Sequence, residues 1–287
     1  MISDSATKTM SYRVLSCLHA VMTKLHPASR YRWSKRLTKL FFFVLTLRKN
    51  TALENLRKAF PGKSEPWYKK TTHACYQSYS WNLIHFLGFP ESLQDIHITV
   101  VGRDQLDATL HQGKGAILVT GHFGSWEILG AWLGSHGYPT APVVQKQHNP
   151  GANRFFYERR EAVGLQQIWQ KAGSTAMTDV IRQGQILCLL SDQDARRKGL
   201  FVSFFNRPSS TPKGTAVFHY RTGAPLILGV CIQRQPFEYE IHFKIITPPE
   251  KRDLTALTQR YTTEMETIIR RHPEQYFWFH RRWKTQP

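Results

Sequence analysis

Short hydrophobic runs alternate with longer helical patterns through most of the chain. Apolar, β-rich runs predict strands over residues 96–101, 116–120, 141–145, 186–190, 201–205, 225–233 and 239–247. Apolar positions that repeat every three or four residues predict helices over residues 51–60, 65–87, 104–111, 125–136, 151–163, 175–182, 212–221 and 254–271. Because strands and helices take turns along the chain, we expect an α/β fold with a central mixed, mostly parallel sheet flanked by helices.

The N-terminal residues carry a different pattern, in which apolar helical faces are interleaved with basic side chains. Residues 12–47 predict one or two amphipathic helices, with a break at His26 and Pro27. The longest apolar run, residues 40–47, has basic flanks and is too short for the roughly 20 residues that span a bilayer. A helical hairpin packed on the main domain would also show this pattern. The basic and aromatic mixture favours a membrane-associating segment over residues 1–50, followed by one α/β domain over residues 51–287.

The charge balance narrows the range of partners. The chain has 39 Lys and Arg against 20 Asp and Glu, a formal net charge of +19. Such an excess favours a polyanionic partner: nucleic acid, an anionic bilayer, a phosphorylated substrate or an acidic carrier protein. A basic, aromatic tail over residues 278–284 would suit base stacking, a bilayer interface or packing back onto the domain, and the sequence leaves these open. No zinc-finger, RRM or helix-turn-helix pattern accompanies it. The four cysteines lack CxxC spacing, so neither a zinc site nor a redox pair is expected.

The strongest candidate for chemistry is His122, in a glycine-flanked turn between the strand over 116–120 and the helix that follows. In open α/β sheets, ligands bind at the carboxyl ends of the strands, where this turn lies. Glu127 follows five residues later, in the first turn of the predicted helix. A histidine oriented by a carboxylate is a competent general base for a hydroxyl, so we predict that Glu127 orients His122. A turn histidine beside an unrelated helix-capping glutamate is the alternative.

Ser125 lies between these two residues and is the nearest candidate nucleophile. A serine elbow would read G-x-S-x-G, but Glu127 occupies the place of the final glycine. We therefore expect Ser125 to cap the following helix, as serine often does. The pattern then favours a direct, base-assisted transfer without a covalent enzyme intermediate.

Basic and polar residues on the predicted helix 151–163 form a second cluster. Asn153 and Arg160 lie within helical reach of each other, and Arg159 adjoins them. Arginines at this place in the chain can clamp a phosphate in a bidentate manner. The same residues would also form an ordinary solvated basic face, and the sequence leaves both interpretations open.

Two further sites follow the later strands. Asp192 comes directly after the buried run 186–190, so it should emerge at the same sheet edge as His122. A metal site built on Asp192 and Asp194 is not favoured, because no third ligand has suitable spacing and three basic residues follow. Lys213 stands at the entry of the predicted helix 212–221, where helix N-termini favour anions, although the P-loop spacing is missing.

An ordered set of motifs resembles a known family. The set comprises NLRKAFP at residues 55–61, GHFGSWE at 121–127, Asn153 through the arginine pair 159–160 to Gly164, DQ at 192–193, FF at 204–205 leading to Thr211 and GTA at 214–216, TGAP at 222–225, and HPEQYFWFHRRWK at 272–284. This set resembles the lipid A biosynthesis late acyltransferases, the lauroyl and myristoyl transferases of the lysophospholipid acyltransferase superfamily. The resemblance covers most of the chain from about residue 50 and implies a fold like that of glycerol-3-phosphate acyltransferase.

The resemblance implies a reaction and its partners. The acceptor would be a hydroxyl on an acyl chain of a phosphorylated glucosamine disaccharide, and the donor a fatty-acyl thioester on acyl carrier protein or, in some members, coenzyme A. His122 would take the acceptor proton with Glu127 orienting it. Arg159 matches the family's arginine block and would bind phosphate or the thioester-side oxyanion, and Asp192 falls in a further family block. No cofactor or metal is implied.

The same resemblance implies a location, the cytoplasmic face of the inner membrane, where acidic carrier protein, lipid phosphates and an anionic leaflet would all suit the positive charge. Many relatives carry an N-terminal transmembrane helix, whereas this chain has a short apolar run broken by charges. Acylation of another lipid or glycolipid, such as a mannosylated phosphoinositide, is the alternative within this class of enzyme. A basic nucleic-acid-binding protein is the alternative outside it.

Overall fold

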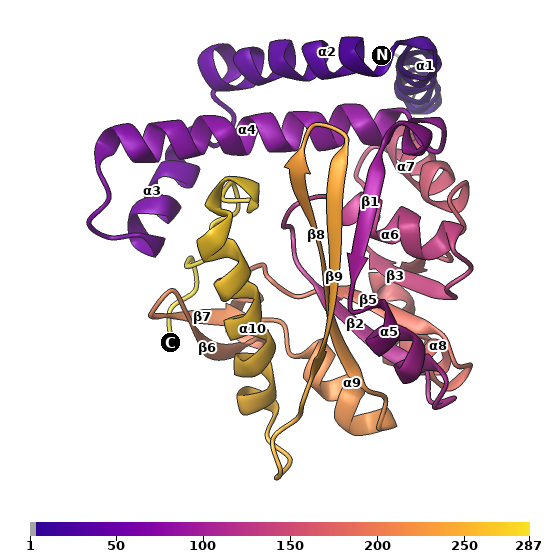
Figure 1. The fold of residues 1–287 in the computed structure, drawn as a ribbon, viewed down its shortest axis with the longest axis vertical. Helices are drawn as coiled ribbons and strands as arrows, with labels where there is room; N and C mark the ends of the chain where they lie inside the picture. The colour runs from indigo at the N-terminus through magenta and orange to yellow at the C-terminus, as the bar shows by residue number, and fades with distance from the viewer. Residues whose placement is uncertain (1–3) are drawn as a thin grey trace.

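The computed structural model describes residues 4–287, and it contains the expected mixed sheet. Seven strands run in the order β1-β9-β8-β2-β5-β3-β4 (Figure 1). Their bounds are β1 His97–Val101, β2 Ala116–Thr120, β3 Thr140–Val144, β4 Ile168–Trp169, β5 Ile186–Leu190, β8 Leu226–Gln235 and β9 Glu238–Ile246. Neighbouring strands are parallel except for β8 and β9, which form an antiparallel pair. The predicted fold class, a mostly parallel sheet flanked by helices, is confirmed.

Helices cover the sheet and connect its strands. The α-helices are α1 Asp4–Lys24, α2 Pro27–Lys39, α3 Lys49–Ala59, α4 Glu65–Leu87, α5 Arg103–Leu110, α6 Trp126–Ser135, α7 Pro150–Glu161, α8 Gly173–Arg182, α9 Gly214–Thr222 and α10 Leu254–Arg271. The shorter ones are the π-helix η1 Leu40–Leu45 and the 3₁₀ turns η2 Glu91–Asp95, η3 Gln170–Ala172, η4 Arg196–Lys198 and η5 Pro273–Gln275. A separate hairpin of β6 Leu200–Phe204 and β7 Arg207–Thr211 lies beside α10 (Figure 1).

The sheet has a hydrophobic core on each face, which explains why its central strand reads as an unbroken apolar run. Every residue of β2 is buried. Successive side chains of a strand point to opposite faces, and here Ile117 and Val119 join one core while Ala116 and Leu118 join the other. Burial on both faces is typical of a parallel strand that is covered by helices. The edge at which β2 ends is therefore held rigidly from both sides.

The N-terminal helices pack over α4 (Figure 1). The predicted break at Pro27 is confirmed, since α1 ends at Lys24 and α2 begins at Pro27. On α1, the Tyr12 hydroxyl donates to the Glu158 carboxylate on α7 at 2.7 Å. The apolar run 40–47 forms a π-helix, η1, that ends in left-handed residues at Thr46 and Arg48. No helix in the described residues has the length and apolarity needed to cross a membrane.

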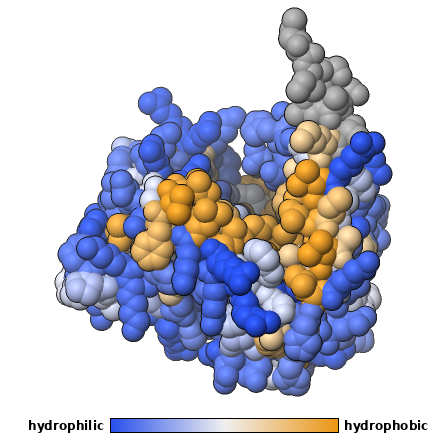
Figure 2. Space-filling view, turned by 90° about the horizontal axis from the view of Figure 1, so that it is seen from above, coloured by the Kyte–Doolittle hydropathy of each residue, from blue (hydrophilic) through white to orange (hydrophobic). Residues whose placement is uncertain are grey.

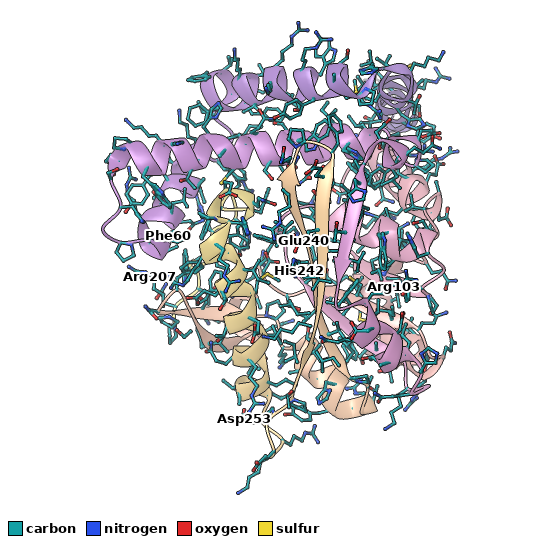
Figure 3. The ribbon with its side chains drawn as sticks, viewed as in Figure 1. Phe60, Arg103, Arg207, Glu240, His242 and Asp253 are labelled. Atoms are coloured by element: carbon teal, nitrogen blue, oxygen red, sulfur yellow. The ribbon has the colours of Figure 1, made fainter. Side chains whose placement is uncertain are left out.

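The C-terminal tail folds back onto the domain. Trp278 is fully buried, and the amide of Asn55 on α3 donates to the carbonyl oxygens of Trp278 and His280 at 2.7 and 2.6 Å. Near the same place, Phe60 packs against Trp278, and Arg207 donates to the backbone of Lys58 at 3.1 Å (Figure 3). Of the open interpretations of the tail, packing onto the domain is the one the structure shows.

Candidate functional site

The site is built where β2 and β5 end side by side. The two strands are parallel neighbours, with Thr120 opposite Leu190, so the residues that follow them emerge at one edge of the sheet. His122 follows β2 and Asp192 follows β5. The two side chains meet there: His122 Nδ1 lies 2.8 Å from Asp192 Oδ1, and the His122 backbone N–H donates to Asp192 Oδ2 at 2.9 Å. Parallel pairing thus converts two distant segments into one histidine–carboxylate pair.

The contact with Asp192 determines which ring nitrogen of His122 is available. Asp192 is buried, and its carboxylate is an acceptor, so Nδ1 carries the proton and Nε2 presents a lone pair. Burial disfavours the imidazolium, but Asp192 outweighs burial and raises the pKa of His122. In turn, burial opposes ionisation of Asp192, but His122, with a smaller contribution from Arg282, lowers the pKa of that carboxyl. The geometry is that of a general base held by a carboxylate.

Glu127 does not have the orienting role predicted for it. Its carboxylate forms a bidentate ion pair with Arg160, with Nη2 to Oε1 at 2.6 Å and Nε to Oε2 at 3.0 Å. Both side chains are about one-fifth exposed. Glu127 belongs to the first turn of α6, where it faces α7 instead of folding back onto the imidazole. The carboxylate that orients His122 is therefore that of Asp192, although the negative charge of Glu127 also raises the pKa of His122.

The other predicted binding residues are dispersed. Arg159 Nη1 donates to the Phe89 carbonyl oxygen at 3.1 Å and to His19 Nε2 at 2.9 Å, so it links α7 to α1. Asn153 accepts a hydrogen bond from the backbone of Gln147 at 2.9 Å. In the structure Asn153, Arg159 and Arg160 each bind a different neighbour, because successive positions of α7 point in different directions.

Lys213 is exposed at the residue before α9. Two residues later, the Thr215 hydroxyl lies 2.7 Å from the Ser191 hydroxyl, and Ser191 immediately precedes Asp192. The start of α9 is thereby tied to the end of β5. Of the predicted binding residues, Lys213 is the one that presents an exposed cation at this edge of the sheet.

Ser125 occupies the N-cap position of α6, as predicted, but its side chain does not cap the helix. Its hydroxyl instead donates to Asn82 Oδ1 on α4, and Asn82 Nδ2 donates to the Gly124 carbonyl oxygen at 2.7 Å. The cap prediction was wrong for the side chain because a tertiary partner competes for the same hydroxyl. Ser125 is buried and engaged, so it is not presented as a nucleophile.

A small pocket adjoins His122, between α4, α6 and the C-terminal segment. Its lining includes Tyr79, Asn82, His122, Trp126 and Phe277. The C-terminal segment also fixes the turn itself, because the Phe277 N–H donates to the His122 carbonyl oxygen at 2.9 Å. No local pattern in the sequence marks Asn82 or the tail as parts of this site, since both come from regions far from residue 122 in the chain.

Asp194, the second aspartate after β5, has structural partners. Its carboxylate accepts from the Thr285 hydroxyl at 2.9 Å, and its backbone N–H donates to His280 Nε2 at 3.0 Å. Another titratable pair, Glu240 and His242, lies on β9, two strands away from β2 in the sheet (Figure 3). Across the described residues, no group of three or more histidine, cysteine, aspartate or glutamate side chains is placed to hold a metal ion.

Comparison with known proteins agrees with this architecture. The family model for bacterial lipid A biosynthesis acyltransferases matches residues 6–285. The chain is 26% identical to a lipid A biosynthesis palmitoleoyltransferase of Escherichia coli over 252 residues, which is 85% of this chain and 81% of that protein. It is also 26% identical to the lipid A biosynthesis lauroyltransferase of Escherichia coli over 278 residues, 90% of this chain and 86% of that protein.

A second group of relatives acts, by name, on a different lipid. The chain is 26% identical to a phosphatidylinositol mannoside acyltransferase of Mycobacterium tuberculosis over 187 residues, 63% of this chain. That match spans only 58% of the mycobacterial protein's length. The family match, in contrast, runs nearly from end to end. This chain therefore belongs to the bacterial lipid A biosynthesis acyltransferase family.

Proposed function

We propose that this protein transfers a fatty acyl chain from an acyl-carrier-protein thioester to a hydroxyl of a lipid A precursor. The observation that carries the proposal is the His122–Asp192 pair, with Nε2 free of the carboxylate and beside a pocket. Membership of the family supports acyl transfer as the reaction class. The relatives named as lipid A acyltransferases support the acceptor.

In the proposed reaction, His122 Nε2 takes the proton of the acceptor hydroxyl as the oxygen attacks the thioester carbonyl carbon. The resulting imidazolium is stabilised by Asp192 at 2.8 Å. The tetrahedral intermediate then collapses, the carbon–sulfur bond breaks, and the leaving thiolate takes the proton from His122. An ester and a free thiol result, and no enzyme-bound acyl group is formed.

Glu127 and Arg160 have supporting roles in this proposal. Their ion pair joins the first turn of α6, where Glu127 lies five residues after the base, to Arg160 on α7. The carboxylate adds negative charge that favours the imidazolium, and Arg160 holds that carboxylate in place. Lys213 is the residue we propose for the acceptor's phosphate, because it is exposed at the same edge of the sheet. Arg159 binds His19 and the Phe89 carbonyl oxygen, and Asn153 binds the backbone of Gln147, so both would support binding only indirectly.

The charge of the chain suits the proposed donor. Acyl carrier protein is acidic, and a formal net charge of +19 would attract it and accelerate encounter. This attraction should weaken with added salt, because the Debye length is only about 8 Å at physiological ionic strength. Coenzyme A thioesters also carry negative charge, on their phosphates, so they should be compared with the carrier-protein thioester as acyl donors.

We also propose that the N-terminal segment rests on the cytoplasmic face of the inner membrane. Figure 2 shows two apolar patches on the face over α1 and α2. They are formed by Met10, Val14, Leu18 and Val21 on α1, and by Phe43, Val44, Leu45 and Leu47 at η1. Between these two patches along the chain, α2 carries four exposed basic side chains: Arg32, Lys35, Arg36 and Lys39. Apolar contact combined with positive charge is the pairing that holds monotopic proteins on anionic lipid.

The first experiment incubates the purified protein with acyl-carrier-protein thioester and a lipid A precursor in mixed micelles. The product should be heavier than the precursor by one acyl chain in mass spectrometry. His122→Ala should lower the rate by at least about 10²-fold, as expected for loss of a general base. His111→Ala, which removes an exposed histidine on another part of the surface, is the matched control.

The second candidate acceptor is a mannosylated phosphoinositide, which the mycobacterial relatives favour. The same assay with this lipid in place of the lipid A precursor separates the two. Transfer to the mannoside but not to the lipid A precursor would contradict the proposed acceptor while leaving the acyl-transfer chemistry intact. No transfer to either lipid from a carrier-protein or coenzyme A thioester would contradict the proposed function.

A further inference from the structure

Gln193 lies against the reactive nitrogen of the base. It follows Asp192 directly, and its side-chain amide nitrogen is 3.4 Å from His122 Nε2. Because Nδ1 donates to Asp192, Nε2 carries the lone pair, and only the NH₂ end of the amide can satisfy it. Gln193 is partly accessible, whereas Asp192 is buried behind it. The side chain therefore stands at the place where an acceptor hydroxyl must bind.

Three backbone donors of the glycine-flanked turn that carries His122 are already engaged within the protein. The His122 N–H is bonded to Asp192 at 2.9 Å. The Gly124 N–H donates to the Gln275 carbonyl oxygen at 2.8 Å, and the Ser125 N–H donates to the Cys231 carbonyl oxygen at 2.9 Å. These three amides fix the turn against Asp192, the C-terminal segment and β8. A side-chain donor beside the reactive nitrogen is therefore a further candidate to stabilise a tetrahedral intermediate at this site.

Two arginines near the turn also have partners within the protein. Arg160 is bound to both oxygens of Glu127 and is held away by that ion pair. Arg282 is buried and donates to the Ser210 carbonyl oxygen and the Thr211 hydroxyl at 2.7 and 2.5 Å. Gln193, in contrast, places an NH₂ group with two N–H donors beside the reactive nitrogen, and in the part of the chain that the structure describes its side chain bonds to His122 alone.

We propose that Gln193 is a further catalytic residue, whose side-chain amide occupies the base in the resting enzyme and donates to the thioester oxygen during transfer. The inference rests on the proposed acyl transfer. When the acceptor hydroxyl displaces the amide from His122 Nε2, the freed N–H bonds to the thioester carbonyl oxygen. As the acceptor oxygen bonds to the carbonyl carbon, its proton moves to Nε2 and the carbonyl π electrons move to the oxygen held by Gln193. Collapse restores the carbonyl and expels the thiolate, which takes the proton back.

Replacement of Gln193 by methionine tests the proposal, since methionine has a similar length but no hydrogen-bond donor. Removal of one preorganised oxyanion donor costs about 10²–10³ in kcat, and we expect Gln193→Met to lose this much. Gln193→Glu should lose at least as much, because a carboxylate cannot donate and repels the oxyanion. KM for both substrates should stay within about threefold, because the donor acts on the transition state. Gln183→Met, on the exposed turn before β5, is the control that should retain wild-type kcat.

A second readout needs no turnover. An amide that donates to the neutral imidazole favours that form, so its removal should raise the pKa of His122 further. An NMR titration of the imidazole should show this rise in Gln193→Met, with an unchanged melting temperature, and a larger rise in Gln193→Glu. A kcat within about threefold of wild type in Gln193→Met, or a titration identical to wild type in both variants, would overturn the inference.

The two proposals fail in different ways. If the wild-type protein transfers acyl groups and His122→Ala abolishes transfer, normal activity of Gln193→Met contradicts only the role of Gln193. If the wild type transfers no acyl group to any lipid tested, the proposed function fails together with the catalytic part of this inference. The titration then still decides whether Gln193 occupies the base.

Discussion

At the scale of single residues, the site depends on how burial and two carboxylates around one imidazole are balanced. Asp192 is buried and binds Nδ1, and Glu127 contributes at longer range while bound to Arg160. Burial of the ring opposes protonation. The combined effect of the two carboxylates is larger than that of burial, so the pKa of His122 is raised. A base of this kind gains driving force for proton abstraction, and it needs a higher pH to be unprotonated.

The pH dependence of the reaction follows from this balance. Transfer requires neutral His122, so kcat/KM should rise with pH through the raised pKa, at a pH above the ordinary value of about 6.5 for histidine. The rise is measured by determining kcat/KM at a series of pH values, with acceptor concentrations that extend up to saturation at each pH. A limb centred below pH 6 would contradict the arrangement, because it would mean that burial prevails over Asp192.

Asp192→Asn should be the most damaging conservative change. The amide can donate to Nδ1 and would favour the tautomer with its proton on Nε2, where the base must accept one. Such a tautomer error costs about 10⁴ in kcat in serine proteases, and we expect a loss of at least about 10³ here. Any remaining activity should show its acid limb at lower pH than wild type. Asp104→Asn, an exposed site on α5, is the control, and comparable losses in both variants would argue against the pair.

At the scale of elements, the turn from β2 to α6 is held by contact between backbones. Gly124 has φ +56°, and a Cβ at this position would lie 1.9 Å from the Cys231 carbonyl oxygen on β8. The left-handed backbone alone disfavours a side chain by about 1 kcal/mol, and the contact with β8 adds a clash that no rotamer can relieve. This close approach explains why glycine is required two residues after His122.

Gly124→Ala should therefore reduce both stability and transfer. We expect the free energy of unfolding to fall by more than about 2 kcal/mol, because backbone must move to admit the methyl group. Gly137→Ala has a similar φ of +77° but open space around the added methyl, so it should cost only the backbone term. Denaturant unfolding of both variants measures the difference. Equal losses would show that the contact with β8 is not what constrains the turn.

Most elements of the fold were predictable because their hydrophobic periods are clear. The bounds of β2, β5, α4 and α10 match the predictions. The strands that the sequence missed are β4, with two residues, and β7, whose residues Arg207–Thr211 are largely polar. β7 pairs only with β6 outside the main sheet, so it has no alternating apolar face to detect. The π-helix η1 was also unpredicted, since an apolar run alone does not report helical pitch.

At the scale of the whole molecule, one face combines exposed apolar patches with basic side chains (Figure 2). Phe43 and Val44 on η1 are 65% and 69% exposed, so neither contributes much to the core. Burying such side chains in a bilayer would gain roughly 1.5–3 kcal/mol each. α4 lies between this face and the sheet, and its residues Tyr79 and Asn82 line the pocket at His122 (Figure 1).

The double variant Phe43→Asp/Val44→Asp should bind anionic vesicles at least about tenfold more weakly than wild type, because it replaces apolar surface by charge that the lipid repels. Co-sedimentation with vesicles of phosphatidylglycerol and phosphatidylethanolamine measures this. Val101→Asp, also an exposed apolar position but on β1, should bind as wild type. Binding of the wild type should weaken with added salt, and equal binding by all three proteins would exclude this face as the membrane contact.

The sequence by itself determined most of the elements, the mixed sheet and the position of His122 in a strand-to-helix turn, because hydrophobic period and glycine-bounded turns are local properties. It also determined the family, through motifs in order along the chain. The partner of His122 was decided only by the tertiary structure. Glu127 is near in sequence, yet its position in α6 directs it to Arg160, while the parallel pairing of β2 with β5 brings Asp192 to the imidazole. The reason is physical. Strand order determines which side chains emerge together at a sheet edge, and strand order cannot be read from the spacing of residues along the chain.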